Sequence, residues 1–128
     1  MICVDTSVWI EFLRGRDRPL VEKLSLLLDD DMVILSRVAM LELMGGASKK
    51  DALLLKTHLS ALPILDPQPT TWDTVEKWIG HSKEKGERFG IVDLLIAAQA
   101  SEQGASVWSL DNDFQRMAKL RFITAFED

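Results

Sequence analysis

The chain has 128 residues, 47% of them hydrophobic, which is typical of one compact domain that buries roughly two thirds of its unfolded surface. Its formal net charge of -5 argues against a nonspecific nucleic-acid-binding protein with a basic surface, but it is compatible with an acidic site that holds cations. No apolar run approaches the length of a membrane span and no signal segment opens the chain, so we expect a cytoplasmic protein without membrane contact.

The first predicted element is a buried strand formed by Met1 to Val4, which leads directly into Asp5. β-Branched residues favour a covered strand, and the Asp-Thr-Ser sequence that follows is typical of a strand exit and a helix cap. Ligands bind at the carboxyl ends of the strands of an open parallel sheet, so Asp5 is well placed for chemistry. Cys3 is the single cysteine and lies inside this strand, where we expect a buried thiol.

The first half of the chain then alternates between helices and short strands. In chain order we expect a helix at Val8–Leu13, a helix containing Leu20 to Leu28, a strand at Met32–Ser36, a helix at Arg37–Met44 that stops at Gly45-Gly46, a helix at about Lys49–Ala61 and a strand at Pro63–Asp66. The three aspartates at 29–31 are expected to form a solvated corner. The helix at about Lys49–Ala61 is predicted to have a buried side formed by Leu53, Leu54, Leu55, Leu59 and Leu62.

The second half continues the alternation. We expect a helix that opens at Thr71 and becomes polar at Ser82, a helix at Ile91–Ala100, a strand at Ala105–Leu110, a short helix through Met117 and a last strand near 122–124. The helix at Ile91–Ala100 is apolar nearly all round and is expected to be central. The whole pattern predicts one α/β domain over residues 1–128, with a mostly parallel central sheet of about five strands flanked by helices.

Four carboxylates stand where the local sequence gives them little structural reason to be: Asp5 and Asp111 after strands, Asp93 at the start of a buried helix, and Glu42 inside an apolar helix. Taken singly, each aspartate is more simply a helix cap or a turn former. Taken together they point to a shared site, because strand ends on one edge of a parallel sheet converge and crowded carboxylates repel one another. A divalent cation removes that repulsion.

The predicted cofactor is therefore Mg²⁺, or Mn²⁺ in its place. These ions prefer oxygen ligands, take few direct carboxylates, and leave positions for water and for phosphate oxygens. The resulting chemistry suits hydrolysis of a phosphodiester bond by metal-activated water.

At these residues the sequence resembles the PIN-domain nucleases, and most closely the VapC-type ribonuclease toxins of bacterial and archaeal toxin–antitoxin pairs. The resemblance runs the length of the chain through four motifs in order, at Val4–Ile10, Met40–Gly46, Gly90–Ala98 and Ser109–Phe114. It implies a PIN domain that acts as a Mg²⁺- or Mn²⁺-dependent endoribonuclease. It also implies an RNA substrate, a homodimer, and a cognate VapB-type antitoxin that covers the acidic groove.

The resemblance also implies roles for individual residues. The catalytic acidic site consists of Asp5, Glu42, Asp93 and Asp111. Asp5 and Asp93 are the expected direct metal ligands, whereas Glu42 and Asp111 hold water molecules around the ion or a second cation, and Ser7 orients Asp5. The last motif leaves a choice between Asp111 and Asp113. We favour Asp111, which directly follows the strand, and expect Asp113 to cap the short helix.

Three alternatives remain open on the sequence. His58 and His81 are candidates for the acid and base of a metal-free ribonuclease that uses the RNA 2′-hydroxyl, although surface positions explain both histidines more simply. A receiver-type phosphoacceptor domain is also a small parallel α/β fold, but it needs an acidic pair after the first strand, where this chain has Thr6-Ser7. A catalytically silent PIN module that only binds RNA or protein is the third.

Basic and aromatic residues supply the candidates for RNA contact. Arg14 and Arg16 follow the first motif and are the favoured phosphate contacts. The other basic candidates are more simply solvated: Arg18, Arg37, Lys49, Lys50, Arg88 and Arg116. Among the tryptophans, Trp9 and Trp108 border predicted core elements, and Trp72 falls on an apolar helix face, so most are expected in the core or a dimer contact rather than on bases.

Overall fold

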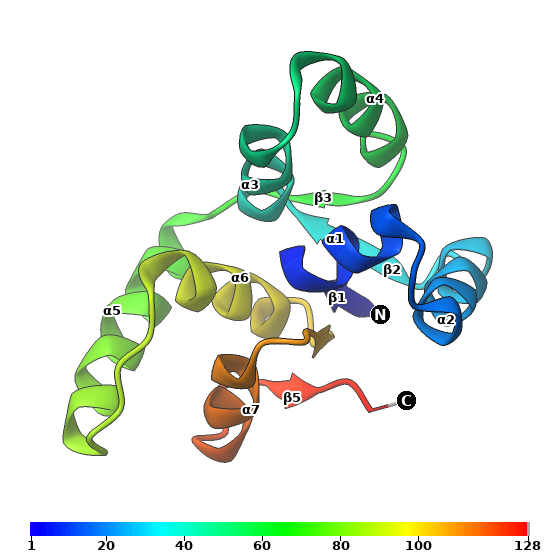
Figure 1. Cartoon of the computed structure of the whole chain (residues 1–128). Helices are drawn as coiled ribbons and strands as arrows, with labels where there is room; N and C mark the ends of the chain where they lie inside the picture. Colours follow the sequence, from blue (N-terminus) through cyan, green and yellow to red (C-terminus); the bar gives the residue numbers. More distant parts are fainter. Residues whose placement is uncertain (128) are drawn as a thin grey trace.

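The computed structural model describes residues 1–127 and contains a five-stranded sheet in the order β3-β2-β1-β4-β5 (Figure 1). Every pair of neighbouring strands is parallel. The strands are β1 (Ile2–Val4), β2 (Val33–Ser36), β3 (Ile64–Leu65), β4 (Ser106–Trp108) and β5 (Thr124–Ala125). The predicted α/β fold with about five parallel strands is confirmed.

Helices make all four connections between consecutive strands. They are α1 (Thr6–Arg14), α2 (Arg18–Asp29), α3 (Arg37–Gly46), α4 (Lys49–Leu59), α5 (Pro69–Glu84), α6 (Ile91–Glu102) and α7 (Asn112–Lys119). Helix α3 packs against α1, α4 and α6, whereas α5 packs along α6 (Figure 1). Over residues 1–127, no helix is long and apolar enough to cross a membrane.

The direction of the chain across the sheet reverses at β1. From β1 the chain moves outward to β2 and β3, and it then returns to β4 and β5 on the other side of β1. The carboxyl ends of β1 and β4 therefore form a topological switch point, where ligands bind in open parallel sheets. Receiver-type domains have the order 2-1-3-4-5 instead, so the receiver interpretation is wrong.

Burial differs from the expectation on the outer helices. Leu55 and Leu59 are buried, but Leu53 and Leu54 of the same helix are 68% and 50% exposed. The reason is that α4 packs mainly on α3, so only one narrow face of it is covered. Trp72 is likewise exposed rather than part of an apolar face, whereas the predicted core positions of Trp9 and Trp108 are confirmed.

Several helix boundaries also differ by one or two residues from the predicted ones, among them the start of α5. Helix α5 begins at Pro69 rather than Thr71, because a proline in the first turn needs no hydrogen-bond acceptor for its nitrogen. The Gln68 N–H donates to Thr71 Oγ1 over 2.9 Å and so closes a capping box at this end. Helix α3 ends at Gly46, as predicted, and includes both glycines as its last residues.

Cys3 is fully buried in β1, as expected, and burial raises the pKa of its thiol to about 12. Only the thiolate reacts with alkylating reagents, so we expect Cys3 to stay unmodified by iodoacetamide in the folded protein at neutral pH and to react fully in denaturant. Intact-mass measurement checks this. Rapid labelling of the folded protein would show that β1 opens to solvent, which contradicts its central place in the sheet.

Candidate metal centre

Asp5 is held at the end of β1 by a set of hydroxyl groups. It is only 5% exposed and is the N-cap of α1. Its Oδ2 atom accepts hydrogen bonds from Ser7 Oγ and Ser109 Oγ, both over 2.8 Å, and from the Ser7 N–H over 3.4 Å. None of the described residues donates to Oδ1. One carboxylate oxygen is thus fixed by the protein, and the other is available to a ligand.

The position of Ser109 follows from the register of the sheet. Val4 pairs with Trp108 across β1 and β4, so the residues that follow them, Asp5 and Ser109, leave adjacent strands side by side. The Asp5 N–H donates to the Trp108 carbonyl over 2.9 Å and extends this pairing by one residue. The predicted orienting contact from Ser7 is present, but the equivalent contact from Ser109 was not predicted.

Replacing Ser109 with Ala should weaken binding of a divalent cation about tenfold, the lower end of the loss that follows removal of a group orienting a ligand. The reason is that Asp5 Oδ2 then keeps only its contacts to Ser7 and can rotate. Calorimetric titration with Mn²⁺ measures the change. Ser60→Ala, at the exposed end of α4, is the matched control and should bind as wild type does. An unchanged affinity in Ser109→Ala would show that this hydroxyl group does not orient Asp5 for the cation.

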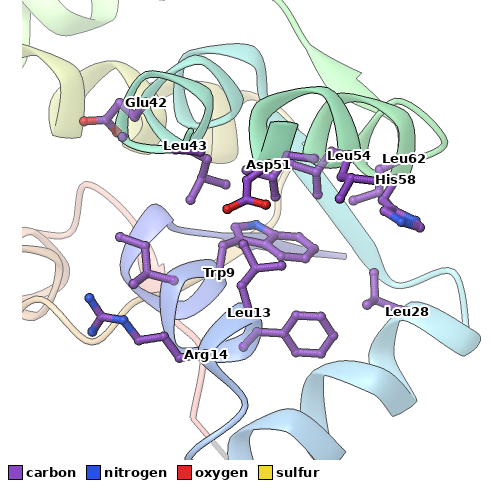
Figure 2. A pocket seen from close by; sticks show the side chains of 16 residues that line it. Trp9, Leu13, Arg14, Leu28, Glu42, Leu43, Asp51, Leu54, His58 and Leu62 are labelled. Atoms are coloured by element: carbon purple, nitrogen blue, oxygen red, sulfur yellow. The ribbon is translucent and has the colours of Figure 1, made fainter. Parts of the chain in front are cut away.

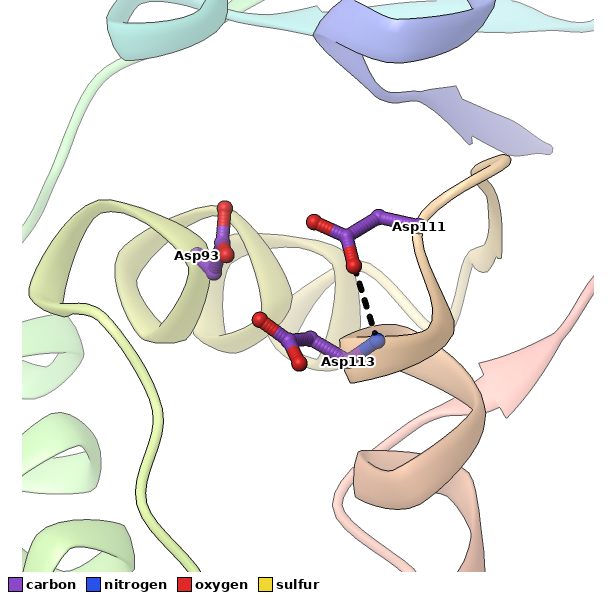
Figure 3. A group of neighbouring side chains, drawn as sticks. All are labelled: Asp93, Asp111 and Asp113. Atoms are coloured by element: carbon purple, nitrogen blue, oxygen red, sulfur yellow. Dashed lines mark hydrogen bonds between the residues drawn. The ribbon is translucent and has the colours of Figure 1, made fainter.

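Three further carboxylates form a cluster that does not include Asp5. Asp93, in the first turn of α6, and Asp111 and Asp113, at the start of α7, each place one oxygen so that these oxygens lie within 4.8 Å of one another. Figure 3 shows the three side chains converging from the two helices. We call this group the carboxylate trio.

The capping role predicted for Asp113 is wrong. Asp111 is the N-cap of α7, and its Oδ1 accepts the Asp113 N–H over 3.0 Å, the dashed line in Figure 3. A cap residue uses one oxygen for the helix, so Asp111 still presents the other to the trio. Asp113 lies in the first turn and points the same way. Both aspartates of the last motif therefore face the site, rather than one of them.

Partial burial and the nearby carboxylates raise the pKa of Asp93 to about 6. Partial burial is the largest cause, followed by the negative charges of Asp5, Asp111, Asp113 and Glu42. Ser109 connects Asp5 to the trio, because its Oγ donates to Asp5 Oδ2 over 2.8 Å and accepts the Asp111 N–H over 2.9 Å. A cation bound among these groups would lower the same pKa and keep Asp93 ionised.

Glu42 stands at the edge of this site. Its side chain is exposed on α3, and its Oε1 accepts a hydrogen bond from Thr6 Oγ1 over 2.9 Å. Thr6 is the first residue of α1, directly after Asp5, so the two motifs are joined by this contact. Glu42 contributes to the raised pKa of Asp93, but it is not one of the trio.

The residues of the rival mechanism do not meet. His58 lies on α4 and His81 on α5, helices at opposite ends of the view in Figure 1. The centroid of the His81 ring lies 5.8 Å from that of the Phe122 ring. Arg14, one of the two residues predicted to contact phosphate, is the last residue of α1 and lies about 13 Å from Asp5 along the helix axis. Its guanidinium pairs with the Glu11 carboxylate over 3.0 Å.

The donor set fits a hard divalent cation. Every candidate ligand is a carboxylate oxygen, as Mg²⁺ and Mn²⁺ require. Asp5 Oδ1 has no donor among the described residues, and the trio gathers three carboxylate oxygens within 4.8 Å of one another. Nitrogen or sulfur ligands, which zinc prefers, are absent from the cluster found within residues 1–127.

An apolar groove begins beside Glu42. It has a volume of about 940 Å³ and runs between α1, α3 and α4 (Figure 2). Its lining is mostly apolar and includes Trp9, Leu13, Leu28, Leu54, Leu55 and Leu62. Asp51 lies over the indole of Trp9 in Figure 2, and Arg14 lies at the rim. The groove thus connects the acidic site to a surface suited to an amphipathic segment.

Comparison with known proteins gives a consistent result. The family model described as "PIN domain" matches residues 2–120. Ribonuclease VapC32 of Mycobacterium tuberculosis is 37% identical over 114 residues, which cover 87% of this chain and 85% of that protein. The fold is shared with a chain of VapBC-1 from nontypeable Haemophilus influenzae (TM-score 0.79, 23% identity, covering 99% of this chain and 98% of that chain). It is also shared with a chain of VapBC2 from Rickettsia felis bound to a promoter DNA fragment (TM-score 0.81, 22% identity, covering 98% of each chain).

Proposed function

This chain belongs to the PIN-domain family, and we propose that it is a Mg²⁺- or Mn²⁺-dependent endoribonuclease that serves as the toxin of a toxin–antitoxin pair. The observation that carries the proposal is the carboxylate trio beside Asp5 at the switch point of the sheet. A relative that is 37% identical over most of both chains is named a ribonuclease, which supports RNA as the substrate.

In this proposal, each residue of the site has a role that follows from its position. Asp5, Asp93 and one or both aspartates of the last motif hold the cation, and Ser7 and Ser109 keep Asp5 in the required orientation. The cation, when bound, lowers the pKa of a water molecule and neutralises charge that develops on the phosphate oxygens. Glu42, fixed by Thr6 at the edge of the site, orients a water molecule for attack on phosphorus.

We propose that the groove between α1, α3 and α4 receives an apolar segment of a VapB-type antitoxin. Several proteins of the same fold were solved as VapBC toxin–antitoxin complexes, which supports a partner of this class. A segment that lies in the groove reaches Glu42, so it blocks access of RNA to the carboxylates. A homodimer and a cytoplasmic location remain predictions from the family, and sedimentation analysis would test the first.

The test of the function is incubation of purified, antitoxin-free protein with total RNA in Mg²⁺, in Mn²⁺ and in EDTA. We expect discrete fragments with either cation and intact RNA in EDTA. Fragments that persist in EDTA would overturn the metal mechanism. Intact RNA in all three buffers, from protein shown by mass spectrometry to carry no partner, would favour the silent PIN module that binds RNA or protein without cutting it.

A further inference from the structure

Arg116 joins three parts of the chain at the edge of the carboxylate trio. It lies on α7, and its Nη1 donates to Asp113 Oδ1 over 2.6 Å. Its Nε donates to Glu87 Oε2 over 2.8 Å, and its Nη2 donates to the same oxygen and to the Arg88 carbonyl. The guanidinium carbon lies 4.6 Å from the centre of the Phe89 ring. The guanidinium is therefore held rigidly beside the site.

One N–H group of this guanidinium has no hydrogen-bond acceptor among residues 1–127. Arginine has five N–H groups, and the contacts to Asp113, Glu87 and the Arg88 carbonyl use four of them. The fifth is on Nη1, the nitrogen that already contacts the trio, and none of residues 1–127 accepts it. The Arg116 side chain is 30% exposed, so it is in contact with solvent at the edge of the site.

A phosphate oxygen is the ligand that this arrangement suits. Arginine binds phosphate through short, charge-assisted hydrogen bonds, and its fixed fork loses little freedom on binding. The neighbouring carboxylates oppose the approach of a phosphate, because the three members of the trio gather their negatively charged oxygens within 4.8 Å of one another. A divalent cation in the trio would remove this opposition.

We propose that Arg116 binds a non-bridging oxygen of an RNA phosphate through the remaining N–H of Nη1, and that the contact forms only when a divalent cation neutralises the trio. The proposal rests on the proposed function, since it assumes that RNA enters this site. It replaces Arg14 as the first candidate for a phosphate contact, because Arg14 lies at the far end of α1.

The test is the affinity of a short, fluorescein-labelled single-stranded RNA, measured by anisotropy at several salt concentrations, in Ca²⁺ and in EDTA. Gel electrophoresis confirms that the RNA stays intact. The variants are Arg116→Gln, Arg116→Lys and, as the matched control, Arg121→Gln. Arg121 carries the same charge but lies near the amino ends of β4 and β5, whereas the carboxylate trio lies beyond the carboxyl end of β4.

In Ca²⁺ we expect Arg116→Gln to bind RNA about tenfold more weakly than wild type, because one charge-assisted hydrogen bond is lost. The slope of log affinity against log salt should fall by about 0.7, the value for one phosphate contact to a single strand. Arg116→Lys, which keeps the charge, should recover most of the affinity, and Arg121→Gln should match wild type. In EDTA all four proteins should bind equally weakly.

Three results would overturn this proposal and leave the proposed function standing. The first is equal affinity of Arg116→Gln and wild type in Ca²⁺. The second is a loss of RNA affinity that is as large in EDTA as in Ca²⁺. The third is weaker Mn²⁺ binding by Arg116→Gln without RNA, since that would make Arg116 a positioning residue for Asp113 instead. Wild-type protein that binds no RNA in either buffer would overturn the proposed function, and this proposal with it.

Discussion

Asp93→Asn should abolish RNA cleavage and, at the same time, make the metal-free protein more stable. Loss of activity follows because an amide is a much poorer ligand for a hard cation than a carboxylate, and we expect a fall in kcat/KM of about a thousandfold or more. The gain in stability follows because the substitution removes a charge that burial and four neighbouring carboxylates disfavour. The measurements are cleavage kinetics in Mn²⁺ and thermal unfolding in EDTA.

The stability effect has a defined pH dependence. The pKa of Asp93 is about 6 in the folded protein against an ordinary value of 3.8, so the folded state holds this proton more tightly than the unfolded chain does. The contribution of Asp93 to stability is therefore fully favourable below about pH 4 and is lost as the pH rises through 6. Without metal, Asp93→Asn should exceed wild type by about 1 kcal/mol, or about 4 °C in Tm, above pH 7. The difference should vanish near pH 4.

Asp30→Asn is the matched control for this prediction. Asp30 belongs to the aspartate corner at 29–31, which is exposed as expected, and the substitution removes the same charge far from the trio. Its Tm should change little at any pH. If Asp93→Asn destabilised the metal-free protein at neutral pH, other groups of the protein would stabilise the charge of Asp93. That result would contradict the claim that this charge needs a bound cation.

Divalent cations should raise the stability of the wild-type protein by a large amount. A cation that binds only the folded state stabilises it by about 2.7 kcal/mol when its concentration is a hundred times Kd, which corresponds to roughly 10 °C in Tm. The reason is that the trio forms, and Ser109 joins Asp5 to Asp111, only in the folded chain. Thermal unfolding with increasing Mn²⁺ at neutral pH measures the shift.

Variants locate the bound cation within the site. Asp5→Asn and Asp93→Asn should lose most of the stabilisation by Mn²⁺, whereas Asp30→Asn should retain it. Asp111→Asn and Asp113→Asn distinguish the two aspartates of the last motif, since the variant with the smaller shift replaces the stronger ligand. A shift that is the same in every variant would place the ion elsewhere and contradict the assignment of the site.

The parts of the site that depend on local pattern were predictable. Asp5 follows a strand with only apolar residues before it, and Asp93 opens a helix that is buried from Leu94 to Ala100. Because parallel strands align their carboxyl ends, the convergence of Asp5 with the residues after β4 could be expected without coordinates. That Asp5 and Asp93 bind a metal ion remains a prediction.

The parts that depend on register and on packing between layers were not predictable. The contact of Ser109 with Asp5 spans 104 positions and is set by the pairing of β1 with β4. The choice between Asp111 and Asp113 depends on which residue caps α7, and the structure has Asp111 as the cap with both carboxylates facing the site. The leucine pattern of α4 predicts Leu53 on the buried side of the helix, but α4 has only one narrow covered side, and Leu53 lies outside it.

Cleavage of RNA in ¹⁸O-labelled water with Mn²⁺, followed by mass spectrometry of the product ends, tests directly whether a metal-activated water molecule is the nucleophile. An attacking water molecule places one labelled oxygen on the terminal phosphate of a product, and no 2′,3′-cyclic phosphate forms. We expect this labelled, linear end with Mn²⁺ and no cleavage in EDTA. A 2′,3′-cyclic phosphate that carries no label and forms in EDTA would show attack by the RNA 2′-hydroxyl, and it would contradict the catalytic role of the carboxylates.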